Sequence, residues 1–553
     1  MPSCSAPGPA APRSASPRWL ETRHIRVAAG AAVILVLAAV ALRLVGLGVR
    51  DLFRDEAASW LLSRYPVGDL VRHTAREAYP PLYPLLLKAW TWLLGDSEVA
   101  MRLLSALAGL IMLLAAWRWA AEALGSGASL VVLGLVAFSP MAVSDARDVR
   151  MYALEAMFAT LAWWFIWRLL HQTTGGAVHR RDQLLAAAFV AGELWSLAYG
   201  LPVAALQAIA VAITWLHARP DPAARSRARS ALAAIIVGAA LFVPWLPSLF
   251  RSAASSSPFW TGPPGRTAPL ETFAAMFVGT SVVPAVLGTT LLVLLLGYGL
   301  DRLLRGRHPD LEDGDARLLG ALLLMGILLI PAIWIGSYLR SVYDQRYFGA
   351  AVAPAALAVA AGWTALVSRL ASPASGGVWR RWGLRLAGVA VVGCVVVGSG
   401  LAFADSFRGI QLAPSNAVMR YLQERMSVGD VVIALDARSY YPIAYLADRS
   451  QSPIDLPGPI WYWRSPGEPA YDGGSLVPAE DSLASSMVND PRWPRVIPGL
   501  RPGGHVWLVA LANGDHDQIG FAPLRHPGLH EADRIFIRPG IEVAQIRRLD
   551  QEG

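Results

Sequence analysis

The chain has 553 residues, of which 55% are apolar and only 16% are charged, and its mean hydropathy is +0.42. Soluble domains carry about 25% charged residues, so this composition excludes an ordinary soluble protein and predicts a polytopic membrane protein. The net charge of +8 is carried almost entirely by arginine. No basic patch interleaved with aromatic residues marks a soluble domain, so we predict no nucleic-acid partner.

The two cysteines, Cys4 and Cys394, lie in a polar tail and in an apolar run. This placement predicts neither a disulfide framework nor a thiolate metal site. The histidines are scattered, without the spacing of a helical metal motif. We therefore predict no metal site and no cofactor, although carboxylates alone could still hold a divalent cation.

Residues 1–26 are rich in Pro, Ser, Ala and Arg, which predicts a disordered basic tail. The chain is then apolar from Val27 to about Val45, long enough for a spanning helix of about 20 residues. A signal peptide is the alternative, but its apolar core is usually only about 7–15 residues long. We therefore predict a first membrane helix with its basic flank, and so the N-terminus, in the cytoplasm.

The segment from Leu47 to Leu87 is the first charged stretch of the chain. It contains the acids Asp55 and Glu56, two short amphipathic stretches and a turn from Tyr79 to Tyr83. Long ordered loops are usually functional, which predicts a reaction site here. The alternative is a solvated loop with Asp55 as a helix N-cap.

Further apolar segments bring the expected number of spans to about eleven. They lie at approximately 99–121, 128–140, 151–170, 184–200, 202–217, 231–247, 275–300, 318–336, 347–369 and 385–404. If the first span runs outward, the cytoplasmic loops contain most of the loop arginines, as the positive-inside rule requires. These loops are 171–183, 218–230, 301–317 and 370–385. The acidic and aromatic residues then gather on the opposite, extracytoplasmic face.

From Asp405 onward the apolar runs shorten to strand length. We expect strands at 431–435, 505–510, 534–537 and 541–546, a helix at 440–446 and a loop over 451–500. No glycine-rich dinucleotide fingerprint accompanies these strands. The predicted fold is therefore a polytopic α-helical module over residues 27–404, followed by an extracytoplasmic α/β domain over residues 405–553.

Charged residues in the predicted extracytoplasmic loops are candidates for chemistry. Asp55 could act as a general base near the membrane surface, and a second group, Asp145 to Arg150, occupies a short loop that must face the same site. The alternative for this second group is a polar helix cap. Arg102 and Arg346 lie on the face where arginine is disfavoured, and a guanidinium suits phosphate binding; their alternative is snorkelling to headgroups.

We predict structural roles for two charged residues that lie within apolar segments. Lys88 is expected to snorkel rather than to bind a ligand. Glu193 sits near the middle of a predicted span, where an acid is a functional candidate by default, but we favour a structural pairing or a protonated state.

Several ordered motifs across residues 45–405 together resemble the GT-C glycosyltransferases of the family-39 type, which includes protein O-mannosyltransferases and the lipid A aminoarabinose transferase. The motifs are Asp55-Glu56, Pro80 to Tyr83, Glu98 to Arg102, Ser139-Pro140, Asp148 to Leu154, Pro244 to Pro247, Pro258 to Trp260 and Arg346-Tyr347. Each motif alone is weak evidence for this family, whereas the order and spacing of all the motifs together are specific to it. The chain departs from the family at Tyr79, where His, Lys or Gln is common, and at Leu197-Ala198-Tyr199, which replaces Thr-His-Tyr.

The resemblance implies transfer of a sugar, with inversion, from a polyprenyl-phosphate donor to an acceptor hydroxyl outside the cytoplasm. It implies an integral plasma-membrane enzyme whose acceptor is a glycan, a lipid or a protein. The expected catalytic residues are Asp55, Glu56 and Asp148. The expected donor-phosphate ligands are Arg150, Arg346 and Arg102. The expected substrate-binding residues are Tyr79, Tyr83, Tyr152 and Tyr347.

The alternative function is a transporter or flippase for a lipid-linked or small saccharide. Transporters usually show internal repeats and charges near the bilayer midplane. In this sequence the charges gather at one surface and no repeat is visible.

Overall fold

The computed structural model describes most of the chain. The described residues are 18–76, 79–171, 177–218, 221–254, 262–279, 282–371, scattered positions between 382 and 404, 415–435, 437–449, 456–463, 482–483, 497–513, 529–537 and 542–551. The first 17 residues of the expected tail, the Pro258–Trp260 motif and most of the loop 370–385 lie outside them.

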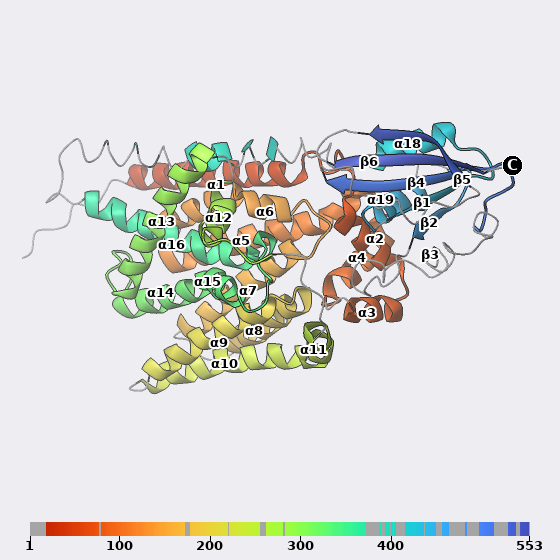
Figure 1. Cartoon of the computed structure of the whole chain (residues 1–553). Helices are drawn as coiled ribbons and strands as arrows, with labels where there is room; N and C mark the ends of the chain where they lie inside the picture. Colours follow the sequence, from red (N-terminus) through yellow and green to blue (C-terminus); the bar gives the residue numbers. More distant parts are fainter. Residues whose placement is uncertain are drawn as a thin grey trace, which may run out of the picture.

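Helices dominate the first 371 residues. Their bounds are α1 Arg18–Leu44, α2 Arg54–Arg64, α3 Val67–Arg76, α4 Leu82–Leu94, α5 Glu98–Ala137, α6 Pro140–Asp145, α7 Tyr152–His171, α8 Ala177–Ser196, α9 Gly200–His217, α10 Pro222–Phe242, η1 Val243–Trp245, α11 Leu246–Ala254, α12 Ala268–Phe277, α13 Val282–Leu304, α14 Asp313–Ile327, α15 Leu329–Gly336, η2 Gln345–Tyr347, η3 Gly349–Ala351 and α16 Val352–Ala371. Helix α1 begins at Arg18, inside the segment expected to be a disordered tail. Figure 1 shows these helices as an elongated bundle, with α2, α3 and α4 gathered at one end.

Eight helical segments among the described residues are long and apolar enough to cross a membrane. One of them, the 40-residue α5, is two helices, because Gly125 interrupts it with φ 84° and ψ 179°. The chain reverses its direction at this break, as two contacts of Arg43 show. Arg43 donates to the carbonyl of Ala137 at 3.2 Å, and it also lies beside Gly109, where an added Cβ would be 3.5 Å from its Nε. A straight helix would separate residues 109 and 137 by about 42 Å. The two apolar segments expected at 99–121 and 128–140 are therefore separate helices that fold back on each other.

Arg43 also binds the C-terminal end of α5 within apolar surroundings. Its side chain is 0% exposed and donates to the carbonyls of Val136 and Ala137, which lie in the last turn of α5. Carbonyls in the last turn of a helix lack intrahelical partners, and a cation is favourable there. Arg43 thus ties the end of α1 to the loop that carries Asp145 to Arg150.

The C-terminal part is an α/β unit. Its elements are α18 Ser415–Arg425, β1 Val431–Ala434, α19 Ala437–Asp448, β2 Ile460–Trp463, β3 Ser482–Leu483, β4 Val506–Asn513, β5 Leu529–Ile537 and β6 Glu542–Gln551. The sheet order is β3-β2-β1-β4-β6-β5, with parallel pairing from β3 to β4 and antiparallel pairing among β4, β6 and β5. Strand β1 is buried along its whole length, as is usual in parallel sheets. The expected strands are confirmed, whereas β2 and β3 both lie in the segment 451–500 that was expected to be a loop.

The sheet unit contacts the end of the bundle where α2 and α4 lie, as Figure 1 shows. Asn416 donates its backbone N–H to Asp51 Oδ2 at 3.0 Å, and Arg449 pairs with Glu98 at 2.6 Å. The rings of Tyr445 and Trp60 meet edge to face, with centroids 5.3 Å apart. The loop between α1 and α5 is therefore held between the bundle and the sheet.

Candidate active site

A buried ion pair fixes the loop that follows α1. Glu56 and Arg102 are 0% and 1% exposed, and the guanidinium meets both carboxylate oxygens at 2.9 and 2.7 Å. The remaining N–H groups of Arg102 donate to the carbonyls of Leu47, Arg50 and Asp51 at 2.6, 2.7 and 3.1 Å. Five N–H donors therefore have five protein acceptors. The expected phosphate role of Arg102 is thus corrected, since none of its donors is left for a phosphate.

Glu56 is equally occupied. Besides Arg102, it accepts from the backbone N–H groups of Phe53 at 3.3 Å and Val149 at 2.9 Å, and it pairs with Arg50 at 3.3 Å. Burial alone would raise the pKa of this carboxyl, but Arg102 and Arg50 hold it below its usual range. A carboxylate held in this way is a poor proton acceptor. The catalytic role expected for Glu56 is therefore replaced by a structural one.

Arg50 links the first loop to the second. Its Nη2 lies 2.5 Å from Asp148 Oδ1, and the same nitrogen contacts Glu56. Burial raises the pKa of Asp148, and Arg50 partly opposes this shift. The expected meeting of the two acidic loops is confirmed, because Glu56 bonds Val149 directly and Arg50 bridges to Asp148.

Asp55 faces away from this buried network. Its Oδ2 lies 3.4 Å from Nη1 of Arg346, and the two side chains are 32% and 36% exposed. Asp344 holds Arg346 in place, accepting from its Nε at 3.2 Å and from its Nη2 at 3.3 Å. A partly exposed carboxylate and a positioned guanidinium therefore sit side by side, although they are far apart in the sequence.

Arg150 approaches Asp55 from the other side. Its Nη1 lies 3.3 Å from the backbone oxygen of Asp55 and 3.4 Å from Oγ of Ser59. Its guanidinium lies over the rings of Tyr79 and Tyr152, 5.6 and 5.8 Å from their centroids. Its buried Nε has no acceptor among the described residues. Unlike Arg102, Arg150 therefore retains donor capacity for a ligand.

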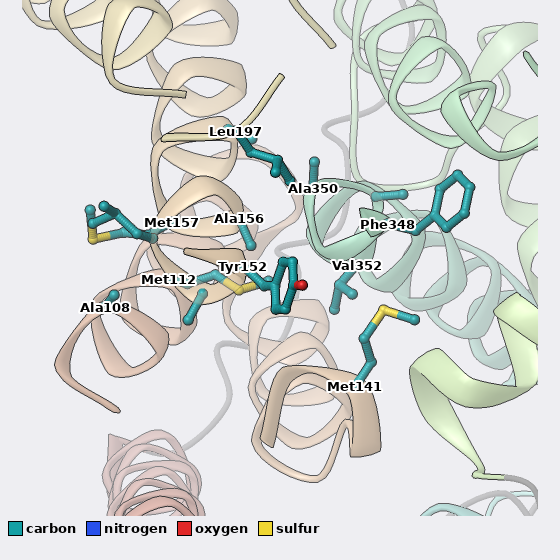
Figure 2. Close-up of a cluster of buried hydrophobic side chains, with 14 of the residues drawn as sticks. Ala108, Met112, Met141, Tyr152, Ala156, Met157, Leu197, Phe348, Ala350 and Val352 are labelled. Atoms are coloured by element: carbon teal, nitrogen blue, oxygen red, sulfur yellow. The ribbon is translucent and has the colours of Figure 1, made fainter. Parts of the chain in front are cut away.

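Aromatic rings separate the two arginines. Arg346 also lies over Tyr152, 5.8 Å from its centroid, and the Tyr347 ring lies 5.9 Å from Tyr152 and 4.3 Å from Tyr199. Figure 2 shows Tyr152 beside Met112, Ala156 and Val352, so the core holds its ring. Tyr152 and Tyr347 are 2% and 5% exposed, so both are buried parts of the site. Tyr83 is 1% exposed and lies apart from them, because its hydroxyl shares a hydrogen bond with Ser105 at 3.0 Å. The substrate contact expected for Tyr83 is therefore corrected to a buried packing role.

A cavity of about 240 Å³ adjoins Arg346 and Asp148. One part of its wall is polar and includes Arg50, Asp145 and Arg147. The other part is apolar and comes from α1, α6, α12 and residue 403: Leu42, Pro140, Met141, Val143, Ala275 and Phe403. The wall therefore combines charged and apolar side chains, and the short helix α6 supplies both kinds.

Asp145 is a buried acid in the wall of this cavity. It is 5% exposed, and its Oδ2 has no hydrogen-bond donor among the described residues. Burial raises its pKa well above the usual range, and the nearby charge of Asp148 adds to the shift. This carboxyl is therefore held in a setting that favours its neutral form.

Three residues of the site were not expected as site residues. Arg50 pairs with Asp148, and Asp344 holds Arg346. Tyr199 stacks on Tyr347. Arg50 and Asp344 lie within a few residues of expected site positions, which is the only signal the sequence offers. No group of three or more His, Cys, Asp or Glu side chains suited to a metal ion occurs in the part of the chain that the structure describes.

Comparisons with known proteins found one matching family model and several similar folds. The family model of dolichyl-phosphate-mannose-protein mannosyltransferases matches residues 78–247. The structure is similar to ArnT from Cupriavidus metallidurans, in its apo state and bound to undecaprenyl phosphate, with TM-scores of 0.60 and 0.59. Identity is 14%, and the match covers 94% of this chain and 98% of ArnT.

A second similar structure is the archaeal oligosaccharyltransferase AglB from Archaeoglobus fulgidus, in complex with an inhibitory peptide and a dolichol-phosphate. Its TM-score is 0.50 at 12% identity, covering 87% of this chain and 69% of AglB. A search of curated protein sequences found no match. The chain is therefore a membrane protein with the GT-C glycosyltransferase fold, whose residues 78–247 match the mannosyltransferase family.

Proposed function

We propose that this protein transfers a sugar from a polyprenyl-phosphate donor to an acceptor hydroxyl on the extracytoplasmic face, with inversion at the anomeric carbon. The observation that carries the proposal is the contact between Asp55 and Arg346, whose charged atoms lie 3.4 Å apart. One of these groups can accept a proton, and the other can stabilise a departing phosphate.

In the proposed reaction the Asp55 carboxylate takes the proton of the acceptor hydroxyl. The hydroxyl oxygen then forms a bond to the anomeric carbon from the face opposite the phosphate. The bond between that carbon and the phosphate oxygen breaks, and its electron pair remains on the phosphate. Arg346 and Arg150 stabilise the developing negative charge.

The remaining site residues have supporting roles in this proposal. Asp148 lines the cavity and holds the guanidinium of Arg50, which also pairs with Glu56. The half-buried Tyr79 can offer a ring face to the sugar. Tyr152 and Tyr347 are 2% and 5% exposed, so they support the two arginines from the core instead of contacting the sugar. Glu56 and Arg102 hold the loop but do not touch the substrate.

The cavity supports a lipid-linked donor. Arg346 in its wall suits a phosphate, and the apolar side chains from α1, α6 and α12 suit part of an isoprenoid chain. Asp55 and Arg150 do not line the cavity, so the sugar has to extend from it toward them. The ArnT structure with undecaprenyl phosphate and the AglB structure with a dolichol-phosphate support the same donor class.

The proposed orientation places the N-terminus in the cytoplasm, and residues 27–404 and 405–553 act as the membrane module and the extracytoplasmic domain. Figure 1 shows the α9–α10 and α13–α14 turns at the end of the bundle away from the sheet. Both turns fall in the arginine-rich loops assigned to the cytoplasm. The Asp55–Arg346 site then faces outward.

The test is transfer in proteoliposomes that contain the purified full chain, undecaprenyl-phosphate sugars as donors and candidate glycan, lipid or peptide acceptors. We expect release of undecaprenyl phosphate that depends on the acceptor and is lost in the Arg346→Gln variant. Movement of the intact donor across the bilayer without cleavage would instead support the flippase alternative and end the proposal.

A further inference from the structure

A second, larger hollow lies away from the proposed reaction site, and we call it the junction hollow. It measures about 620 Å³ and lies where α2, α4 and the end of α19 meet. Its walls include Trp60, Arg64, Lys88, Trp92, Asp96 and Asp448. Ligand sites often form where two structural units meet.

Hydrogen bonds within the helical part, together with one from α19 of the sheet unit, hold the walls of the junction hollow. Trp60 donates its indole N–H to Asp96 at 3.2 Å, and the Tyr445 hydroxyl donates to the Asp96 carbonyl at 3.1 Å. Lys88 donates to the carbonyl of Ser63 at 3.0 Å, which joins α4 to α2. The hollow is therefore preformed, so a ligand does not have to order it.

One aromatic ring in this hollow is almost entirely exposed. Trp92 is 88% exposed, whereas the neighbouring wall residue Trp60 is 1% exposed. Arg64 lies over the Trp60 ring, 5.1 Å from its centroid. Trp92 is therefore the ring that can offer a face to a ligand, and an apolar ring face suits the C–H face of a sugar.

The charges around Trp92 are balanced. Two acids, Asp96 and Asp448, face two cations, Arg64 and Lys88, and Arg64 pairs with Asp448 at 3.0 Å. A site for a phosphate or an anionic headgroup needs an excess of cations. Balanced donors and acceptors beside an exposed ring instead suit a neutral compound with many hydroxyl groups.

We propose that the junction hollow binds a neutral saccharide, and that this saccharide is a distal part of the acceptor. The assignment as acceptor rests on the proposed transfer reaction. Helix α2 carries Asp55 near its start and Ser63 of the hollow near its end. These two residues are about 12 Å apart along the helix axis, but Trp60, Ser63 and Arg64 face the hollow from one side of α2 and Asp55 lies on another side. An oligosaccharide held at Trp92 therefore has to pass around α2 to present another hydroxyl near Asp55.

Binding is measured first, without any need for transfer. Labelled full-length protein in lipid nanodiscs is applied to an array of neutral oligosaccharides of mixed hexose and pentose composition. We expect retention on a subset, about tenfold weaker for Trp92→Ala and weaker for Asp448→Asn, which removes a carboxylate from the opposite wall. Leu93→Ala is the matched control, because Leu93 is 67% exposed on the same helix but does not line the hollow.

The Asp55→Asn variant separates the two proposals. The variant should keep saccharide binding and lose transfer. If the wild type binds the saccharide but transfers no sugar, the saccharide site is supported and the proposed reaction is wrong. With a bound oligosaccharide as acceptor, Trp92→Ala should raise the KM for that acceptor and leave kcat unchanged. Equal retention of Trp92→Ala and Leu93→Ala, or no retention at all, overturns the saccharide site. If an anionic lipid co-purifies with the wild type and is lost from Trp92→Ala, the hollow binds a lipid headgroup, and the proposed saccharide site is wrong.

Discussion

Nη1 of Arg346 lies 3.4 Å from Oδ2 of Asp55, although 291 residues separate them in the sequence. Asp344 holds the same guanidinium through two hydrogen bonds, and the Tyr152 ring lies beneath it. Burial would lower the pKa of Arg346, but Tyr152 and Asp344 raise it, so the side chain stays charged. A permanent positive charge is therefore fixed beside a partly exposed carboxylate.

Replacing Arg346 by Gln should reduce transfer by about 100-fold or more, because one positioned cation no longer stabilises the leaving phosphate. The rate of undecaprenyl-phosphate release measures the effect. Arg340→Gln is the control, since Arg340 is exposed in the same connecting segment and does not line the cavity. Equal loss in both variants would contradict a specific role for Arg346.

Arg150 tests whether geometry matters beyond charge. Arg150→Lys keeps the positive charge but loses the Nε donor, which has no acceptor among the described residues, and the planar stacking on Tyr79 and Tyr152. We expect transfer to fall about tenfold in Arg150→Lys and about 100-fold in Arg150→Gln. If the lysine variant keeps full activity, the positive charge at position 150 suffices and a hydrogen bond from Nε of Arg150 to the phosphate is not needed.

Substitutions of Glu56 and Arg102 should lower the stability of the fold and should not act directly on catalysis. Glu56→Gln removes the charged partner of a fully buried guanidinium and is expected to cost about 3–5 kcal/mol. Thermal unfolding and size-exclusion profiles in detergent measure this loss. Glu424→Gln breaks an exposed pair with Arg425 and should cost at most about 1 kcal/mol.

A double variant separates this pair from a general effect of substitution. Glu56→Gln with Arg102→Met removes both charges, so it should be less destabilised than the sum of the single variants. Additive losses would show that the two side chains are not coupled. A Glu56→Gln protein with normal stability but no transfer would restore Glu56 as a catalytic candidate.

Asp145 should make stability depend on pH. Its pKa is raised in the folded state, so the folded protein keeps a proton that the unfolded chain has released. Stability therefore falls as pH rises from the unfolded pKa, about 4, toward the folded value. Asp145→Asn cannot ionise, so its gain in Tm over the wild type should grow between pH 5 and pH 8. The exposed Asp69→Asn is the control, and a pH-independent difference for Asp145→Asn would contradict the raised pKa.

The sequence predicted much of the architecture because burial leaves a strong pattern. Long apolar runs predicted the helices, and the short run at 431–435 predicted β1, which is buried throughout. Strand β2 was missed because it lies in a Pro- and Trp-rich segment. Its strand conformation depends on pairing with β1, where Val432 lies opposite Ile460, and such long-range pairing leaves little local signal.

The candidate site was predictable at the level of loops but not of individual donors. The topology predicted from the arginine bias puts the Asp55, Asp148 and Arg346 loops on one face, and the structure brings these loops together. The sequence does not distinguish Arg102 from Arg150, since both are arginines near the same surface. Only the folded chain shows that carbonyls and Glu56 occupy every donor of Arg102.

Tyr83 illustrates the same limit. It belongs to the Pro-Pro-Leu-Tyr motif, so its neighbours in the sequence suggested a substrate contact. In the structure it lies in the first turn of α4 and points to Ser105 of α5. Which face of a short helix packs inward is decided by its neighbours, and the sequence does not name them.

The most direct measurement is single-turnover transfer by Asp55→Asn in proteoliposomes loaded with an undecaprenyl-phosphate sugar, beside Asp69→Asn as a folded control on the adjacent helix α3. Loss of the general base should lower the rate about 10²–10⁴-fold, while Tm and donor binding match the wild type. Asp69→Asn should transfer at the wild-type rate, because its exposed pair with Arg72 contributes little. An Asp55→Asn protein that transfers sugar at the wild-type rate would contradict the central claim that this carboxylate accepts the acceptor's proton.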